Sequence, residues 1–390
     1  MQKLTWINLL ILFFILTING IFPAVSIYNS DSPDKSQLTP LFRGVNLGDA
    51  LDAPQEGAWG VVLQEDFFQL IKDAGFNLIR IPIRWSAHAE IDSPYTIDEV
   101  FLERVDWAVN QSLSRGCVTI INIHHYEEIM IDPQAHKTRF LALWQQLSVH
   151  YQNYSENLYF ELLNEPNSQL NSSLWNQFLQ EAIDIVRETN DKRILLVGPT
   201  NWNNPSDLDF LSLPQDDPNI MVTFHYYSPF QFTHQGADWV SGSDQWLGTN
   251  WTGTPAEKEA IRQDFDAAVQ WANDHNRTLF LGEFGAYRKA DMDSRVRWTT
   301  FIAMEAEKRN ISWCYWDFCS NFAIYDWILE RWIPQLLQAL LPESPFLTST
   351  TSTSSTIVSN STVTTNASFI SSLFIVLFIC ILYRKYRKKN

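Results

Sequence analysis

Cysteine is scarce in this 390-residue sequence, which has only four. Their spacing matches neither a disulfide framework nor a zinc site. Cys314 and Cys319 lie close enough in sequence to pair, but the apolar residues around them favour an interpretation as core residues. The sequence also has no glycine-rich phosphate-binding loop and no internal repeat. We therefore expect neither a cofactor nor a metal.

Basic residues are also in deficit: 28 Lys and Arg stand against 44 Asp and Glu, giving a net charge of −16. This balance excludes nucleic acids and other anionic polymers as natural partners, and leaves neutral polymers compatible. Aromatic residues make up 14% of the chain, with 16 Trp. Trp can fill a core, but its flat ring also stacks on sugars.

Long apolar runs are confined to the two ends. Residues 1–26 contain Lys3, an apolar stretch and then small residues, which predicts a signal peptide; an uncleaved anchor is the alternative. Residues 344–364 form a Ser/Thr-rich linker. Residues 365–383 are predicted to form a transmembrane helix, and 384–390 a basic cytoplasmic tail. We therefore expect a single-pass protein of the cell membrane whose large domain, 38–343, lies outside the cell.

Between these ends, short apolar runs alternate with segments of helical period. Strands are predicted at 41–47, 76–83, 118–124, 157–164, 193–199, 220–227, 278–285 and 311–318. Helices are predicted at 61–74, 97–115, 136–151, 174–189, 256–275, 292–309 and 329–341. Eight strand–helix units of this size predict an α/β fold, the TIM (β/α)8 barrel. The fifth unit is the weakest, because residues 201–218 are too rich in Pro and Asn for a long helix.

Two predicted strands end on a carboxylate. Glu165 follows the apolar run that begins at Tyr159, and Pro166 stops that run. Glu283 ends another strand with Gly282 and Gly285 beside it, which allow a close approach of backbone or ligand. In a parallel barrel both strand ends face one cleft, and two facing carboxylates are what glycosidic-bond cleavage requires.

Other strand ends carry polar groups as well. They read Ile-Arg-Ile-Pro at 79–82, Ile-Asn-Ile-His-His at 121–125, Leu-Asn-Glu-Pro at 163–166, His-Tyr-Tyr at 225–227, Gly-Glu-Phe-Gly at 282–285 and Tyr-Trp-Asp-Phe at 315–318. In this order and spacing the sequence resembles glycoside hydrolase family 5, the retaining cellulase-type barrels. The segment 227–239 is similar to that of thermophilic bacterial endoglucanases that also accept β-mannans.

The resemblance implies a role for each matched residue. Glu165 would be the general acid/base and Glu283 the nucleophile. Substrate-binding or supporting roles would fall to Arg80, His124, His125, Asn164, His225, Tyr227, His234, Trp239 and Trp316. Among these, Arg80 and Tyr227 would keep Glu283 ionised, and His225 would orient Glu165. Desolvation and the charge of Glu283 would raise the pKa of Glu165.

The chain departs from its near relatives on the sugar-binding side. It has Asp49-Ala50-Leu51-Asp52 where Asn-Ala-Leu-Glu is frequent, and Asp317 where Glu is common. These departures affect substrate preference rather than reaction class. A metal cluster of His124 and His125 with Glu127 and Glu128 is disfavoured, because adjacent residues of a strand point to opposite faces.

The sequence therefore predicts an extracellular, monomeric enzyme without metal or cofactor. Its expected activity is a retaining endo-β-1,4-glucanase acting on a neutral β-linked polysaccharide. A β-mannanase, an exo-acting glucanase and a non-hydrolytic polysaccharide-binding surface protein remain alternatives.

Overall fold

The computed structural model describes residues 41–350. The predicted signal peptide, transmembrane helix and basic tail lie outside these residues, as does most of the predicted linker. Among the helices of residues 41–350, none is both long and apolar enough to cross a membrane.

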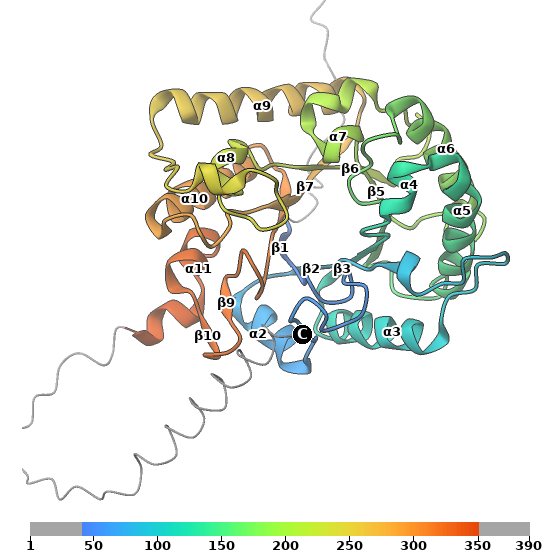
Figure 1. Cartoon of the computed structure of the whole chain (residues 1–390), viewed down its shortest axis with the longest axis horizontal. Coiled ribbons are helices and arrows are strands. Elements are labelled where there is room, and N and C mark those ends of the chain that lie inside the picture. Colours follow the sequence, from blue (N-terminus) through green and yellow to red (C-terminus); the bar gives the residue numbers. More distant parts are fainter. Residues whose placement is uncertain (1–40, 351–390) are drawn as a thin grey trace, which may run out of the picture.

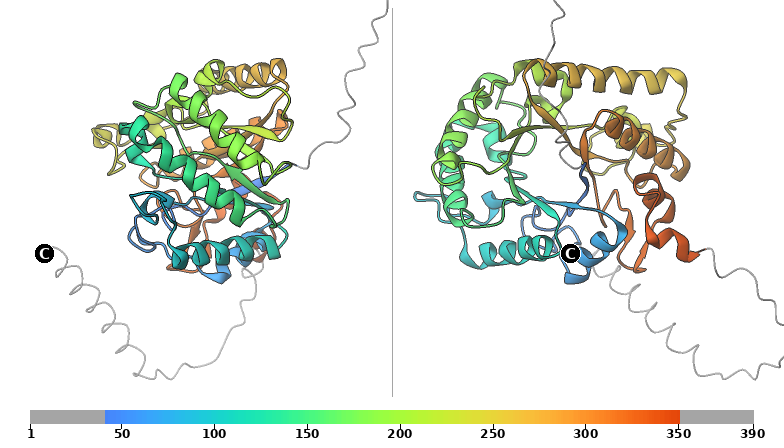
Figure 2. Two further views of the ribbon diagram at one scale, coloured as in Figure 1. Left: turned by 90° about the vertical axis from the view of Figure 1, so that its right-hand side faces the viewer. Right: turned by 180° about the vertical axis from the view of Figure 1, so that it is seen from behind.

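Eight parallel strands close into a barrel in sequence order, which confirms the predicted TIM barrel. They are β1 Arg43–Asn46, β2 Leu78–Ile81, β3 Val118–Asn122, β4 Leu158–Glu161, β5 Leu195–Val197, β6 Ile220–His225, β7 Thr278–Phe284 and β8 Ser312–Tyr315. Closure is made by β1 and β8, where Gly44 pairs with Cys314. The helices form an outer ring around the strands (Figure 1), and the same enclosure is visible from the side and from behind (Figure 2).

The main helices of the ring are α2 Glu65–Ala74, α3 Glu99–Ser114, α5 Pro133–His150, α6 Ser172–Arg187, α9 Pro255–Asp274, α10 Met292–Lys308 and α11 Pro334–Leu340. Shorter helices are α4 Glu127–Ile131, α7 Thr200–Asn203 and α8 Phe230–Thr233, and a hairpin joins β9 Tyr325–Asp326 to β10 Arg331–Trp332. N-cap residues mark the starts of several helices. Asp98 caps α3 by accepting a hydrogen bond from the backbone N–H of Phe101, and Thr254 forms a capping box with Glu257 at α9.

The fifth unit lacks a long helix, as its composition predicts. After β5 the chain makes α7, in which Asn201, Trp202 and Asn203 all have a positive φ of 55–60°. A 3-10 helix, Pro205–Phe210, follows and packs against α9. Because no long helix follows β5, the chain forms a loop there whose side chains can reach the barrel mouth.

The interior of the barrel is arranged in layers. Leu78, Ile120 and Phe280 form an apolar lower layer with neighbours such as Cys314. Because side chains alternate along a strand, the positions two residues later, including Arg80 and Asn122, form the layer above. This upper layer is polar, so the polar groups meet at the carboxyl ends of the strands.

Register shifts in the β6–β7 and β7–β8 ladders shape this upper layer. The β6–β7 register shifts after Phe224, so that His225 pairs with Glu283. Such bulges re-aim side chains at a barrel rim. A Cβ on Gly285 would meet the backbone carbonyl of Trp316, the close backbone approach that was predicted, whereas one on Gly282 would meet a side chain, with Oγ1 of Thr223 2.5 Å away.

Candidate active site

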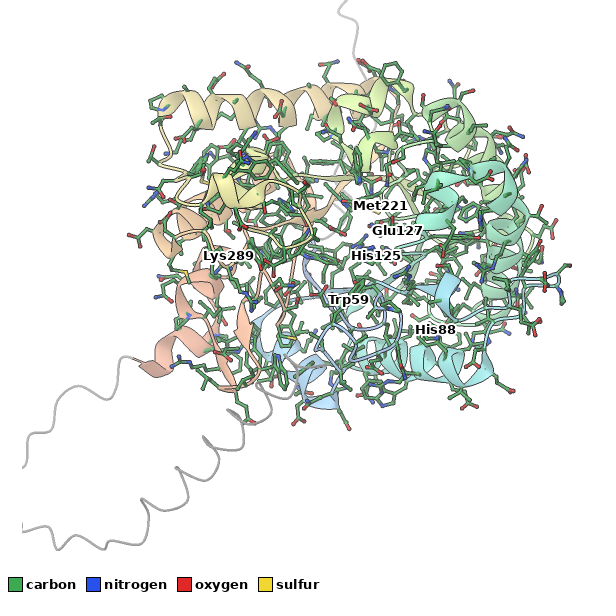
Figure 3. All side chains as sticks on the ribbon, viewed as in Figure 1. Trp59, His88, His125, Glu127, Met221 and Lys289 are labelled. Atoms are coloured by element: carbon green, nitrogen blue, oxygen red, sulfur yellow. The ribbon has the colours of Figure 1, made fainter. Side chains whose placement is uncertain are left out.

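A cavity of about 650 Å³ opens at the carboxyl ends of the strands. Its lining contains most of the predicted site residues: His124, His125, Glu165, Tyr227, His234, Trp239, Glu283 and Trp316. The remaining three, Arg80, Asn164 and His225, are buried. The cavity is also lined by Asp49, Trp59, Arg84, Glu127, Asn321 and Phe322. Figure 3 shows Trp59, His125 and Glu127 near one another in the middle of this face.

Arg80 is the buried cation of the site. A guanidinium has five N–H groups, and each of those of Arg80 has an acceptor. Two go to Glu161 at 2.6 and 2.7 Å, one to Asn46 at 2.8 Å, one to Asn164 at 2.7 Å and one to Glu283 at 2.6 Å. Arg80 and Glu161 are both fully buried. The guanidinium therefore fixes Glu161, Glu283 and Asn164 relative to one another.

Sequence reasoning missed Glu161 and Asn46 as parts of this site. Glu161 lies two residues after Tyr159 inside an apolar run, where a charged residue is a signal of a buried partner. Asn46 ends β1, and its amide also donates to the carbonyl of Gly282 at 3.1 Å. Both residues hold Arg80 rather than facing the cavity.

The two predicted carboxylates come together around His225. Nδ1 of His225 lies 2.7 Å from Oε1 of Glu165 and 3.6 Å from Oε2 of Glu283. An oxygen of Glu165 and one of Glu283 lie within 4.8 Å of each other. The hydroxyl of Tyr227 donates to the second oxygen of Glu283 at 2.9 Å.

The surroundings of the two carboxyls differ in charge. Burial raises the pKa of Glu165 to about 7. Burial also raises the pKa of Glu283, but the charge of Arg80 opposes that rise. Burial lowers the pKa of His225 to about 4 and raises that of Tyr227 well above its usual range. Neutral His225 and the Tyr227 hydroxyl are therefore hydrogen-bond donors, and Glu165 is the carboxyl that retains a proton near neutral pH.

His124 and Trp316 form one wall of the cavity. Their rings are nearly parallel at an angle of 9°, with centroids 5.7 Å apart. Asn122 fixes the tautomer of His124. The Oδ1 atom of Asn122 accepts a hydrogen bond from the backbone N–H of Ile83, so the Nδ2 atom of Asn122 faces Nδ1 of His124 at 3.0 Å. The proton of His124 consequently lies on Nε2.

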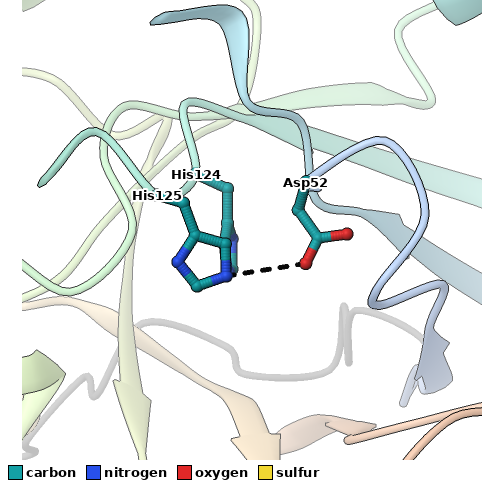
Figure 4. A group of neighbouring side chains, drawn as sticks. All are labelled: Asp52, His124 and His125. Atoms are coloured by element: carbon teal, nitrogen blue, oxygen red, sulfur yellow. Dashed lines mark ion pairs between the residues drawn. The ribbon is translucent and has the colours of Figure 1, made fainter. Parts of the chain in front are cut away.

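The expectation that His124 and His125 face opposite sides was wrong. The strand β3 ends at Asn122, and His125 has a φ of 48°, so alternation does not extend to it. Both rings line the cavity, with centroids 4.5 Å apart. Figure 4 shows them beside Asp52, whose Oδ2 lies 3.6 Å from Nε2 of His125.

A group of two histidines and a carboxylate invites a metal, and Asp52, His124 and His125 are close enough to share one. Their protonation does not suit a metal. Nδ1 of His124 accepts from Asn122, and its Nε2 carries the proton. Burial lowers the pKa of His125, but Asp52 and Glu127 raise it to about 9, so this ring is an imidazolium at neutral pH. Neither imidazole offers a free lone pair.

Aromatic side chains form the rim of the cavity. Trp239 is 55% exposed and contacts His234, as expected for the lip of a cleft. Trp59, 42% exposed, packs edge-on against His125 at 5.2 Å, and sequence reasoning missed it. Its signal was a Trp in a Gly-containing loop after the first strand. Trp144 and Trp271 are buried in the core.

The three acidic departures are neighbours, since Asp49 lies near enough to Asp52 and to Asp317 for their charges to interact. Asp49 has a φ of 60° and accepts from Ser320 and, at 3.1 Å, from the Asn321 amide. Asp317 is buried, and burial raises its pKa to about 8. Asp52 is fully buried and accepts from the backbone N–H of Ala50.

Comparison with known families gives the same assignment. The model of the family described as Cellulase (glycosyl hydrolase family 5) matches residues 38–322. The chain belongs to glycosyl hydrolase family 5. Among family members, Endoglucanase H of Acetivibrio thermocellus is 37% identical over 303 residues, covering 76% of this chain and 32% of that protein. Endoglucanase B of Clostridium cellulovorans is 29% identical, and the match covers 76% of this chain and 73% of that protein. The chain thus spans only about a third of Endoglucanase H.

Solved family 5 structures agree in fold. Cel5A of Thermotoga maritima, solved in complex with mannotriose, is 49% identical with a TM-score of 0.76, covering 77% of this chain and 97% of that one. The same protein has been solved with cellobiose. The cellulose synthase subunit Z of Clostridioides difficile is 42% identical with a TM-score of 0.75, covering 77% and 99%.

The Arg80 contacts predict that replacing Arg80 by Lys lowers the stability of the protein far more than replacing Arg84 by Lys. Arg80→Lys keeps the charge but loses the planar fork, leaving Glu161 and Asn164 short of donors in the interior. We expect the free energy of unfolding to fall by roughly 3 kcal/mol, as for a broken buried ion pair. Arg84→Lys is the matched control, because Arg84 lines the same cavity without an ion pair in the described residues. Urea unfolding measures both, and equal effects would contradict the assignment.

Proposed function

We propose that the barrel is an endo-β-1,4-glucanase that hydrolyses its substrate by double displacement with retention of configuration. The observation that carries this proposal is the approach of Glu165 and Glu283 within 4.8 Å. Retaining glycosidases hold their two carboxyls about 5 Å apart, whereas inverting ones need roughly 6.5–9.5 Å for an intervening water. The separation therefore supports direct attack by one carboxylate.

In the first step, Glu283 attacks the anomeric carbon as the glycosidic C–O bond breaks. Glu165 gives its proton to the leaving oxygen, so a glycosyl ester of Glu283 and a free sugar end are formed. Arg80 and Tyr227 each donate to a separate oxygen of Glu283 and favour its ionised form. In the second step, Glu165 takes a proton from water as the water oxygen displaces Glu283 from the same carbon.

The names and ligands of the relatives support the substrate class. Several relatives are named endoglucanases, and the mannotriose and cellobiose complexes of Thermotoga Cel5A indicate a family member that takes both sugars. We infer that a β-1,4-glucan is the main substrate and that β-mannan is a second one. Trp59, Trp316 and Trp239 line the cavity and would stack against neighbouring sugar rings.

Removal of either proposed catalytic carboxylate tests the mechanism. We expect Glu283→Ala and Glu165→Ala each to lower hydrolysis of carboxymethylcellulose or glucomannan by about 10³-fold or more, as loss of a nucleophile or an acid/base requires. Added azide should restore turnover of an activated aryl cellobioside, giving the α-azide with Glu283→Ala and the β-azide with Glu165→Ala. The control is Glu128→Ala, which removes an exposed carboxylate of α4 outside the cavity. A wild type as inert as the variants, with polymer binding intact, would instead indicate a binding protein.

We further propose that the barrel works outside the cell as a monomer held at the membrane. The support is in the sequence: residues 365–383 are mostly apolar, five basic residues follow within 384–390, and the uncharged linker 344–364 separates them from the barrel. Expression of the full chain should place activity on intact cells, removable by external protease. Truncation after residue 350 should release that activity into the medium, and activity found only inside the cells would contradict the proposal.

A further inference from the structure

Asn203 lies directly beneath the histidine that holds Glu165. Its side chain is fully buried, and its Nδ2 lies 3.3 Å from Nε2 of His225. On the other side of the ring, Nδ1 lies 2.7 Å from Glu165. The imidazole thus connects Asn203 to one oxygen of Glu165.

With the amide nitrogen of Asn203 on the side of the imidazole, as in the structure, this contact sets where the imidazole carries its proton. An amide N–H facing Nε2 requires a lone pair there, so the single proton of a neutral ring must lie on Nδ1. A proton on Nδ1 is donated to Oε1 of Glu165. The other oxygen of Glu165 is then the one that can hold the transferable proton.

The chain is built to place Asn203 at this position. Asn201, Trp202 and Asn203 are consecutive left-handed residues, a conformation that a bulky residue such as Trp adopts only where its surroundings enforce it. The backbone N–H of Trp202 bonds to the carbonyl of Pro166, next to Glu165, at 3.3 Å. A Cβ on Gly198 would lie 2.1 Å from Oδ1 of Asn203, so a glycine is needed behind the amide.

We propose that Asn203 is a positioning residue: by donating to Nε2 of His225, it keeps the imidazole proton on Nδ1 and so directs the acid proton of Glu165 to the oxygen that faces the substrate. This inference rests on the proposed glycosidase function for its catalytic consequence, but the hydrogen-bond assignment stands independently of that function.

Other charged groups also face this pair. Glu283 on β7, Arg80 on β2 and Glu161 on β4 act on the charge of His225. His125, after β3, and Glu127 on α4 act on Glu165 together with Arg80 and Glu161. All of them are unchanged when Asn203 is replaced, so a change in titration would come from position 203.

The test variant is Asn203→Asp, which keeps the shape but replaces the N–H donor by an acceptor. A carboxylate facing Nε2 favours a proton there and an imidazolium at His225, and a cation beside Glu165 lowers the pKa of that carboxyl. The alkaline limb of kcat/KM, expected near pH 7 in the wild type, should therefore move about one pH unit or more lower. The control is Asn204→Asp, which adds the same charge one residue away, where the side chain is exposed and accepts from the backbone N–H of Ser206.

Leaving-group dependence provides a second kinetic readout. A misplaced acid proton slows cleavage of an unactivated cello-oligosaccharide more than that of dinitrophenyl β-cellobioside, whose leaving group needs little protonation. We expect at least about a tenfold greater loss of kcat/KM for the unactivated substrate in Asn203→Asp. Asn203→Ala should show the same selectivity if the Asp variant does not fold. An unchanged alkaline limb, or equal losses on both substrates, would overturn the proposal.

A nitrogen-15 NMR spectrum of the histidines separates this proposal from the proposed function, because it needs no activity. Wild-type His225 should show a protonated Nδ1 and an unprotonated Nε2, and Asn203→Asp should show a protonated Nε2. A protonated Nε2 in the wild type would overturn the role of Asn203 even in an active enzyme. An inert wild type with the expected tautomer would instead contradict the glycosidase function alone.

Discussion

The whole site depends on one buried cation, Arg80, and on which of the three nearby carboxyls, Glu161, Glu165 and Glu283, it hydrogen-bonds. Arg80 binds Glu161 through two hydrogen bonds and Glu283 through one, and it makes no hydrogen bond to Glu165. Burying a charge is costly unless it is paired, so the two carboxyls in contact with the guanidinium are the ones that can remain ionised. Glu165 has a neutral histidine as its partner, and burial raises its pKa to about 7, so this carboxyl keeps its proton up to near neutral pH. The chemical difference between Glu165 and Glu283, the two carboxyls proposed to be catalytic, thus follows from which of them Arg80 contacts.

The rest of the upper layer keeps this arrangement in place. A bulge after Phe224 brings His225 opposite Glu283, and Gly282 leaves room beside the imidazole. Asn122 and Asn203 each present an amide to a histidine, at His124 and His225 respectively. Both histidines are neutral by burial, so their tautomers are set by hydrogen bonds rather than by charge. Amides are suited to this task because they do not titrate.

Much of this site was readable from the sequence, because the barrel places the ends of consecutive strands at one mouth. The motifs around Arg80, Glu165, His225 and Glu283 needed only that rule to be brought together. Side-chain contacts between strands across the barrel could not be predicted from the sequence. Glu161 and Asn46 reach Arg80 from other strands, and their side-chain direction depends on strand alternation and on the closed ring.

The conformation of the loops was harder still to predict from the sequence, for a different physical reason at each position. His125 lies beyond the end of its strand with a left-handed backbone, so the rule of alternation failed there. The turn at 201–203 also has a left-handed backbone, and no local pattern predicts three such residues in succession. The predicted signal peptide and transmembrane helix fall outside residues 41–350 and remain predictions.

The stereochemistry of the first product tests the central claim most directly. If ionised Glu283 attacks and protonated Glu165 assists, the new sugar end keeps its configuration. Proton NMR of a cello-oligosaccharide digest, recorded within minutes and before mutarotation, should show the β-anomer first, with the α-anomer appearing later. An α-anomer formed first would show inversion and would contradict the pairing of Arg80 with an attacking Glu283.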